Sequence, residues 1–531
     1  MKILPGFLSR SAIVFLFFVS CTTIKETAEM ANYNDFRFLE YTVEQMQNGF
    51  RSGEFTIEEV VQAYLDRIEA IDKNWPALNS VITVNPDALT IARELDQELK
   101  DGKIRGPLHG IPVLLKDNID THDRMPCTAG SRALANSYPL SDSRVAAKLR
   151  EAGAVILGKA SLSEWANFRG TPSSSGWGGI HGQTKNPYDL TRNPCGSSSG
   201  SGAAVSANLS MLAIGTETDG SIVCPSHANG IVGLKPTVGL ISRSGIIPIS
   251  ITQDSPGPMG RSVADVAACL GALTGIDSSD ARTLESSGKY HSDYTVFLKK
   301  NGLKGKRIGF FTGASGRHYK VDSLMNRTVE LLKSAGAEVV MIDRITGPEA
   351  DAYSFEVMLY EYRDGLNRYF AGLGPAAPVK SIEELIAFNQ ADSVELLHYN
   401  QEYLEMALKK GDLSSPGYKK ALAGMMEQSR TNGIDRVMNE HRLDAIMAPT
   451  GTPAWKTDLV NGDNYQIGTS SPSAQAGYPI ISLPMGVIDG LPVGVSFYGK
   501  AWSEPLLIEI ASGFESVNPQ RIIPQFLNGN D

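Results

Sequence analysis

Apolar residues recur every three or four positions in the first part of the chain, which is the spacing of an amphipathic helix. The run IEEVVQAYLDRIEAID, residues 57–72, is the clearest example. Thr56 and Glu59 at its start have the spacing of a capping box, and Thr42 with Gln45 show the same spacing upstream. The pattern therefore predicts two capped amphipathic helices.

Farther along the chain, helical patterns alternate with short apolar runs. The segment SDSRVAAKLREAGAVILG, residues 141–158, predicts a capped helix, a glycine terminator and a buried strand. Similar alternation follows over residues 306–343, and residues 350–441 are mainly helical in pattern. Further strands are predicted near the C-terminus, at 443–450 and 478–486. Helices that alternate with buried strands are typical of an α/β fold.

The N-terminus has the pattern of a signal segment. Lys2 and Arg10 accompany the apolar run AIVFLFFV, residues 12–19, which is too short to span a bilayer. The run ends in FVSC, which resembles a bacterial lipobox whose cysteine, here Cys21, is acylated.

This segment predicts an exported protein. Residues 1–20 are expected to be a lipoprotein-type signal peptide, 21–35 a polar tether, and 36–531 the globular domain. The expected location is the periplasm or the cell surface, with membrane contact only through a lipid anchor at Cys21. An ordinary secretory peptide cleaved nearby is the alternative, and the protein would then be secreted.

The composition excludes several classes of function. The chain has 531 residues, 42% of them hydrophobic, so it can bury a large core. The formal net charge of -9 indicates no basic face for a phosphate backbone, so nucleic acid is not expected as a partner. The five cysteines show no metal-ligand spacing, and an odd number is a poor disulfide framework. Four of them are expected to be buried or incidental thiols: Cys127, Cys195, Cys224 and Cys269.

Several short motifs do not fit their surroundings. Residues 153–160, GAVILGKA, begin like a phosphate-binding loop, but Ala160 replaces the residue that would hold Mg²⁺ and the segment is strand-like. The chain has no HExxH motif, so catalytic zinc has little support. The stretch GSSSG at 196–200 matches a nucleophile elbow centred on Ser198, yet prolines and polar residues precede it instead of the required strand.

Two serine-bearing turns flank one short predicted helix. The run GSSSGSG, residues 196–202, has the composition of a flexible linker, but it leads directly into the small and apolar residues 203–212. Those residues predict a closely packed helix, which a solvated linker would not precede. A second turn, TETDGS at 216–221, follows the helix. This arrangement indicates a site.

Lys116 ends the apolar run GIPVLLK, residues 110–116. A lysine in this position most often extends to solvent or pairs with a neighbour such as Asp117 or Asp120. If the amine is desolvated in a pocket instead, its pKa falls and the neutral form can act as a base. The residues alone leave both interpretations open.

Three motifs, taken together and in this order, resemble the amidase signature family. They are GIPVLLKDNI, NPCGSSSGSGAAV and GTETDGSIVCPSHANGIVGLKPTVGLISRSGIIPIS, and the similarity extends over most of residues 36–510. The resemblance implies a single amidase-signature domain of the α/β class, with a central mixed β-sheet covered by helices on both faces. It also implies an amidase that uses no cofactor and no metal.

The resemblance assigns a role to each matching residue. Lys116 matches the family's catalytic lysine, Ser197 its bridging serine in a cis peptide, and Ser221 its nucleophile. Neutral Lys116 would take a proton through the Ser197 hydroxyl, which both donates and accepts, and so activate Ser221. The oxyanion hole would consist of backbone N–H groups of Thr218, Asp219, Gly220 and Ser221.

The motifs depart from the commoner family pattern at a few positions. Ser199 and Asp219 stand where glycines are usual, and Asp219 is expected to bring a carboxylate near the pocket. The strings NPCGSSSGSG, GTETDGSIVCP and ITQDSPGPM resemble the peptide amidase branch. His227, six residues after Ser221, is expected to be structural, because the family's mechanism uses no histidine.

The expected function is a serine amidohydrolase that converts linear carboxamides to acid and ammonia, with small amides or amidated peptides as substrates. C-terminal amides of peptides are the expected substrate class. The alternatives are a broad-specificity aliphatic, aryl or fatty acid amidase, a non-catalytic surface lipoprotein, and an amidotransferase subunit. Cys127, Tyr360 and Gln475 are candidates for the pocket wall.

Overall fold

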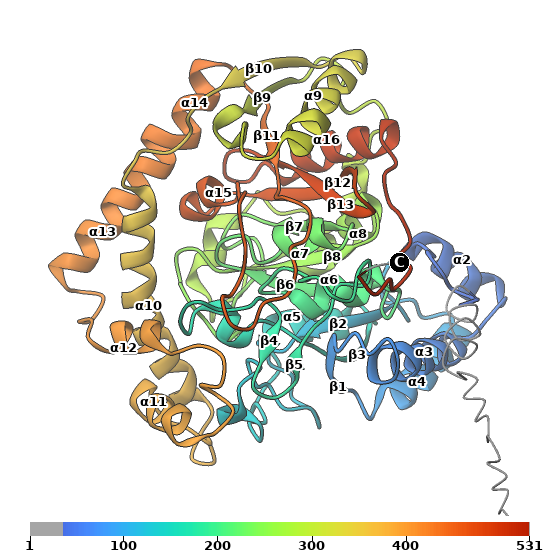
Figure 1. The fold of residues 1–531 in the computed structure, drawn as a ribbon. Coiled ribbons are helices and arrows are strands. Elements are labelled where there is room, and N and C mark those ends of the chain that lie inside the picture. Colours follow the sequence, from blue (N-terminus) through green and yellow to red (C-terminus); the bar gives the residue numbers. More distant parts are fainter. Residues whose placement is uncertain (1–34, 530–531) are drawn as a thin grey trace, which may run out of the picture. The chain divides into compact units, whose positions relative to one another are not determined.

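Strands from distant parts of the chain join in one mixed sheet (Figure 1). The computed structural model describes residues 35–529, and within them the sheet has 11 strands in the order β1-β3-β2-β6-β8-β7-β12-β13-β11-β9-β10. Their bounds are β1 Val81–Val84, β2 Pro112–Lys116, β3 Val155–Ala160, β6 Leu212–Glu217, β7 Val232–Lys235, β8 Ser255–Gly260, β9 Arg307–Phe311, β10 Glu338–Ile342, β11 Ala445–Pro449, β12 Ile480–Ile488 and β13 Leu491–Tyr498.

Parallel and antiparallel pairs both occur in this sheet. Strand β2 lies between β3 and β6 and is parallel to both, whereas β6 is antiparallel to β8. Every residue of β2, β3 and β6 is buried, as expected for strands with both faces covered. The predicted α/β fold with a central mixed sheet is therefore confirmed.

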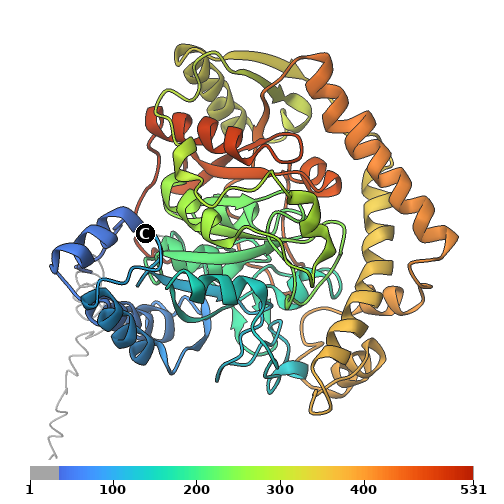
Figure 2. The ribbon, with the colours of Figure 1, turned by 180° about the vertical axis from the view of Figure 1, so that it is seen from behind.

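Helices cover both faces of the sheet. On one face α6 (Ser199–Ser206) packs against α7 (Val223–Ala228), and on the other α8 (Val263–Leu273) packs against α16 (Glu504–Val517), as Figure 2 shows from behind. Glycine allows α6 to approach α7 closely, because a Cβ at Gly202 would lie 2.9 Å from a backbone oxygen of α7.

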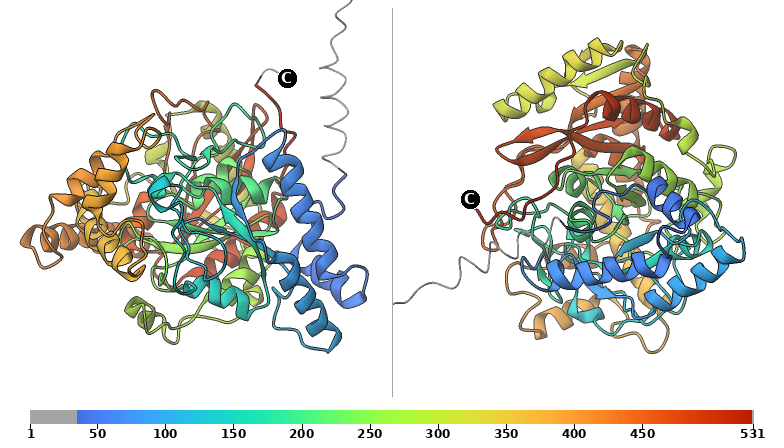
Figure 3. Two further views of the ribbon diagram at one scale, coloured as in Figure 1. Left: turned by 90° about the horizontal axis from the view of Figure 1, so that it is seen from below. Right: turned by 90° about the vertical axis from the view of Figure 1, so that its right-hand side faces the viewer.

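The remaining helices surround the sheet. Helices α3 and α4 pack together against β3 (Figure 3), and α10 packs against both α12 and α13. The bounds are α2 Val43–Ser52, α3 Ile57–Arg67, α4 Ala88–Lys100, α5 Arg144–Glu151, α9 Tyr319–Ser334, α10 Ala350–Gly372, α11 Ile382–Ala391, α12 Glu402–Leu408, α13 Pro416–Met426, α14 Asp435–Glu440 and α15 Ser471–Ala476.

The elements predicted from hydrophobic spacing are present. Thr42 with Gln45 and Thr56 with Glu59 form complete capping boxes at the starts of α2 and α3. The mainly helical pattern of residues 350–441 corresponds to α10 through α14, and the two C-terminal strand predictions correspond to β11 and β12. The local pattern was sufficient here because α2 and α3 each have one apolar face, and β11 and β12 are almost continuous runs of buried residues.

The predicted signal peptide, with Cys21, lies outside the described residues, as does the predicted tether apart from Asp35. The boundaries of these segments stay predictions. Among the described residues, 40–529 belong to one compact unit and those before Glu40 to another. None of the helices in residues 35–529 combines the length and apolar character that crossing a membrane requires.

Candidate active site

Lys116 is the last residue of β2, and its side chain is completely buried. Its Nζ lies 2.7 Å from Ser197 Oγ, 2.9 Å from Thr216 Oγ1 and 3.1 Å from the Thr216 carbonyl oxygen. Among the described residues the amine has no carboxylate within ion-pair distance, so Lys116 is paired with neither Asp117 nor Asp120. Of the two interpretations left open by the sequence, the structure therefore agrees with an amine that is desolvated inside the protein.

Burial shifts the pKa of the Lys116 amine from its usual 10.5 down to about 7, although the charges of Asp254 and Glu217 oppose the shift. Near neutral pH the amine is therefore close to half deprotonated. Three oxygens surround the amine as hydrogen-bond acceptors: Ser197 Oγ and the two Thr216 oxygens. When the amine is neutral it donates only two hydrogens, and its lone pair can then accept from the Ser197 hydroxyl.

Ser197 lies in a tight turn that precedes α6. The Gly196–Ser197 peptide is cis, as the resemblance implied. A side chain at position 196 would displace Ser163, because a Cβ at Gly196 would lie 2.3 Å from Ser163 Oγ. The Ser197 carbonyl accepts from the Ser163 N–H at 3.0 Å, and the next amide, Ser198 N–H, donates to the Ser221 carbonyl at 3.1 Å. The two serine-bearing turns are thus in direct contact.

Ser221 lies at the end of the second turn, between β6 and α7. Gly220 has a φ of 80°, a left-handed conformation that favours glycine. The Glu217 carboxylate accepts from the N–H groups of Ile222 at 2.7 Å and Val223 at 3.0 Å. These bonds satisfy amides that would otherwise be unpaired at the start of α7, and they hold Ser221 at the edge of the helix.

Three consecutive amides of this turn have no hydrogen-bond acceptor among the described residues. They are the N–H groups of Asp219, Gly220 and Ser221. The Ser221 hydroxyl likewise makes no hydrogen bond within residues 35–529, and Ser221 is 9% exposed. Unpaired backbone donors beside a free hydroxyl can bind an oxygen that carries negative charge.

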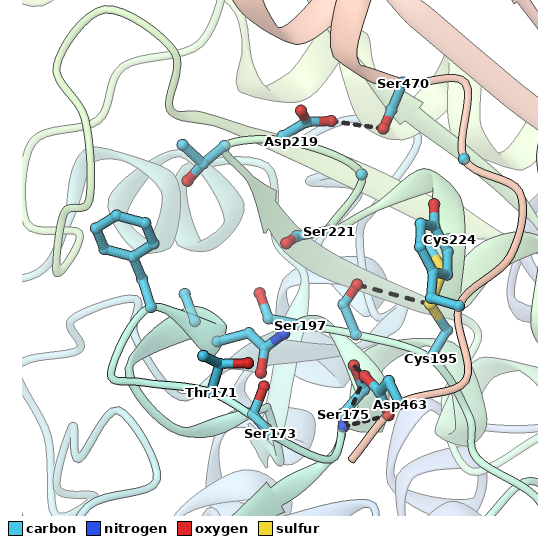
Figure 4. A pocket seen from close by; sticks show the side chains of 18 of the residues that line it. Thr171, Ser173, Ser175, Cys195, Ser197, Asp219, Ser221, Cys224, Asp463 and Ser470 are labelled. Carbon is cyan, nitrogen blue, oxygen red and sulfur yellow. Dashed lines mark hydrogen bonds between the residues drawn. A yellow bond between two sulfur atoms is a disulfide. The ribbon is translucent and has the colours of Figure 1, made fainter. Parts of the chain in front are cut away.

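Both turns open into one cavity of about 630 Å³, where the hydroxyls of Ser197 and Ser221 lie (Figure 4). A volume of this order is typical of a small-molecule site. The wall combines apolar side chains with hydrogen-bonding groups. The apolar part consists of Phe168, Ile249, Met358, Trp455 and Tyr465, and the polar part includes Thr171, Ser173, Ser175, Asp463 and Ser470.

Asp219 also lines this cavity, so the expected carboxylate near the pocket is present. Ser470 Oγ donates to Asp219 Oδ1 at 2.6 Å, which joins the turn that carries Ser221 to a loop from a distant part of the chain (Figure 4). Burial raises the pKa of the Asp219 carboxyl to about 6. The cavity therefore gains a negative charge as pH rises above about 6.

The prediction of four thiols is wrong for two of them. Cys195 and Cys224 form a disulfide, whereas Cys127 and Cys269 are free and buried as expected. The two half-cystines are 29 residues apart in sequence, and their Cα atoms are 5.8 Å apart. An odd cysteine count and this separation gave no sign of the pairing, which depends on how the two serine-bearing turns meet.

Ser198 and His227 do not line the cavity. Ser198 Oγ donates to the Thr216 carbonyl at 3.1 Å and accepts from the Thr216 N–H at 3.2 Å, so its hydroxyl is engaged by β6. The nucleophile-elbow interpretation of Ser198 is therefore not supported by its position. His227 is buried in α7, and burial lowers the pKa of its ring to about 4. This position fits a structural role.

The three residues suggested from sequence for the pocket wall are elsewhere. Cys127 and Gln475 are buried away from the cavity, and Tyr360 packs against Tyr418. Besides the two turns, the wall residues come from segments before α6, between β7 and β8, before α9 and after β11, and from α10. In residues 35–529, no His, Cys, Asp and Glu side chains gather in a group that could hold a metal ion.

Comparison with known proteins places this site in context. A family model described as Amidase matches residues 59–508. A probable amidase of Arabidopsis thaliana is 41% identical over 505 residues, which cover 93% of each chain. The solved structure of peptide amidase from Stenotrophomonas maltophilia has 47% identity and a TM-score of 0.88, and the match covers 92% of this chain and 99% of that one.

Two further matches are a second peptide amidase structure and an amidotransferase subunit. A solved complex of peptide amidase with the competitive inhibitor chymostatin is 48% identical, with a TM-score of 0.90, and the match covers 92% of this chain and all of that one. A glutamyl-tRNA(Gln) amidotransferase subunit of Fusobacterium nucleatum is 32% identical over 495 residues, which cover 90% of this chain and 96% of that protein.

The predicted export and lipid anchoring at Cys21 are contradicted by the relatives. The lipobox is a bacterial signal, whereas the amidase from Arabidopsis thaliana and matching putative amidases from Schizosaccharomyces pombe and Arthroderma benhamiae are eukaryotic, and none is named as an exported protein. A short apolar run with a following cysteine is too weak a pattern to establish export or a lipid anchor.

Proposed function

The chain belongs to the amidase family, and we propose that its site hydrolyses primary carboxamides to acid and ammonia, with C-terminal amides of peptides as substrates. The observation that carries the proposal is the buried Lys116 amine, 2.7 Å from Ser197 Oγ and with a pKa lowered to about 7 by burial.

In the proposed mechanism Lys116 is the base, Ser197 the bridge and Ser221 the nucleophile. Ser221 Oγ attacks the carboxamide carbon while its proton passes to Ser197 Oγ, and the Ser197 proton passes to neutral Lys116. The proton then returns through the same path to the leaving nitrogen, which departs as ammonia. Water attacks the acyl-enzyme in the same way and releases the acid.

The oxyanion would be stabilised by the turn that carries Ser221. The unpaired N–H groups of Asp219, Gly220 and Ser221 support this role, and Thr218 is the fourth residue proposed for the hole. One such donor typically lowers the barrier by about 3 kcal/mol. The bonds from Ile222 and Val223 to Glu217 keep those amides from competing for the oxyanion.

The peptide specificity rests on two supports. The chain is 47% identical to a peptide amidase over nearly its whole length, against 32% for the amidotransferase subunit. The cavity wall also combines apolar and hydrogen-bonding side chains, which suits a peptide better than a purely aliphatic chain. A broad-specificity aliphatic, aryl or fatty acid amidase remains the alternative.

Ammonia release tests the proposal. Purified protein is incubated with an N-acetylated dipeptide amide, an aryl amide, a fatty acid amide and glutamine, in parallel with Ser221→Ala. We expect the dipeptide amide to be hydrolysed with the highest kcat/KM and Ser221→Ala to be inactive. Preference for the aryl or fatty amide would reject the peptide specificity, and undiminished activity of Ser221→Ala would reject the nucleophile.

A further inference from the structure

The Cys195–Cys224 disulfide joins the two serine-bearing turns covalently. Cys195 lies two residues before Ser197, and Cys224 lies three residues after Ser221. We infer that this disulfide is a positioning element for the reaction proposed above: it fixes the Ser197 turn against the Ser221 turn, and its reduction by a dithiol lowers kcat. The inference depends on the proposed roles of both serines.

On the Ser197 side, the disulfide holds a backbone conformation that disfavours a side chain. Cys195 has a φ of 58°, in the left-handed region where residues other than glycine are strained. Its N–H donates to Asn193 Oδ1 at 2.8 Å, and its carbonyl accepts from Ser199 Oγ at 2.6 Å. Cys195 is thereby fixed immediately before the Gly196–Ser197 peptide.

On the Ser221 side, the disulfide reaches the first turn of α7. The Cys224 N–H donates to the Gly220 carbonyl at 2.8 Å, so Cys224 is bonded directly to the turn that carries Ser221. The Glu217 carboxylate binds the two amides between Ser221 and Cys224. A displacement of Cys224 would therefore also displace Ser221.

In the described part of the chain, the noncovalent bonds between the two turns are made by Ser198 and not by Ser197. The Ser198 N–H donates to the Ser221 carbonyl at 3.1 Å, and Ser198 Oγ is bonded to the carbonyl and the N–H of Thr216. Proton transfer between Ser197 and Ser221 requires their hydroxyls within hydrogen-bond reach, and a displacement of about 1 Å can reduce a rate by about 100-fold. The disulfide therefore restrains the two turns whose relative position determines the rate of proton transfer.

The disulfide is part of the cavity wall (Figure 4), so a reductant small enough to enter this cavity can reach it. A dithiol thiolate attacks one sulfur and forms a mixed disulfide, and the second thiol of the reagent then closes a ring. The products are the thiols of Cys195 and Cys224 and one oxidised, cyclic reagent. Two electrons pass from the dithiol to the protein disulfide.

Kinetics of cysteine variants separate positioning from stability. Cys195→Ser and Cys195→Gly both remove the disulfide, but Cys195→Gly also removes the strain at φ 58°. Cys269→Ala, in α8, is the matched control because this thiol is buried outside the site. All proteins are compared by kcat, KM, the midpoint of the pH profile and Tm.

We expect kcat to fall about 10-fold to 100-fold in both Cys195 variants, with KM within about twofold and an unchanged pH midpoint, since Lys116 stays buried. Cys269→Ala should retain the wild-type kcat. A fall in Tm without a fall in kcat, measured well below Tm, would show that the disulfide only stabilises the fold and would overturn the inference.

Reduction of the wild-type protein gives a second, independent result. Thiol labelling should detect two additional thiols per molecule when the disulfide is reduced. We expect kcat to fall in proportion to the fraction of protein that is reduced, and to recover after reoxidation. Full kcat with both thiols labelled would also overturn the inference. If the oxidised wild-type protein releases no ammonia from any amide, the proposed function fails instead, and the two failures are distinguishable.

Discussion

The Lys116 amine and the Ser197 hydroxyl are hydrogen-bonded at 2.7 Å in a completely buried position. Removal of the amine by Lys116→Met is expected to lower kcat by about 10²-fold to 10⁴-fold, the usual contribution of a positioned base. Lys116→Arg should be equally inactive, because a guanidinium stays protonated and cannot accept a proton. Steady-state ammonia release measures both variants.

Lys235→Met is the matched control for this experiment. Lys235 is also a fully buried lysine at the end of a strand, but its amine donates to the Tyr478 carbonyl at 2.7 Å and lies outside the cavity. Its loss should lower Tm while kcat stays within about tenfold of the wild type. A kcat as low as that of Lys116→Met would mean that any buried lysine has this effect.

The pH dependence of kcat/KM should follow the Lys116 amine. Because burial lowers its pKa to about 7, the amine is protonated and unable to accept a proton below that pH. We therefore expect kcat/KM to rise with pH, to reach half its maximum near pH 7, and to be about one tenth of the plateau at pH 6. A profile that is flat between pH 5.5 and 8.5 would exclude this base.

Ser221 and Ser198 provide a matched pair of hydroxyl deletions. Ser221→Ala should lower kcat by at least about 10⁴-fold without loss of stability, because its hydroxyl makes no hydrogen bond within the described residues. Ser198→Ala should instead lower stability and keep most of the activity. Without the two bonds between Ser198 Oγ and Thr216, the free energy of unfolding should fall by about 1–3 kcal/mol.

Asp219→Asn tests whether the oxyanion hole uses only backbone groups. The amide oxygen of asparagine can still accept from Ser470 Oγ, which donates to Asp219 Oδ1 at 2.6 Å. We expect kcat at pH 8 to stay within about threefold of the wild type, since backbone N–H groups do not change. A loss of 100-fold would show that the carboxylate itself takes part, and the pH profile would identify its titration near pH 6.

Glu217→Ala should destabilise the turn that carries Ser221. Glu217 is buried, and its carboxylate accepts from two backbone amides at 2.7 and 3.0 Å. Leaving those amides unpaired should lower the free energy of unfolding by about 2–4 kcal/mol, measured by urea denaturation. Glu217→Gln keeps an acceptor oxygen and should lose less. Equal stability of both variants and the wild type would contradict this role.

The sequence predicted those parts of the fold that depend on local spacing. Capping boxes at Thr42 and Thr56 and the apolar runs of β3 and β11 are visible in the chain because each involves neighbouring residues. The serine-bearing turns were also visible, since Gly and Ser cluster in them. The contact of Lys116 with Ser197, over 81 residues, was implied by the family resemblance and not by spacing.

Features that need tertiary contact could not be predicted. The Cys195–Cys224 disulfide forms because the two serine-bearing turns meet in the folded protein. From the odd number of cysteines we expected both residues to be free thiols. Cavity walls such as Met358 and Trp455 come from segments more than a hundred residues from Ser221 and carry no motif. At the N-terminus an apolar run and Cys21 suggested export, which the eukaryotic relatives contradict.

The proposed relay is tested most directly by an NMR titration of the Lys116 side chain, in protein labelled with ¹³C at lysine Cε and assigned by comparison with Lys116→Arg. The shift in Cε resonance should give a midpoint near pH 7, as its burial dictates. If the amine remains protonated above pH 9, no neutral base is present at this site and the proposed mechanism is wrong.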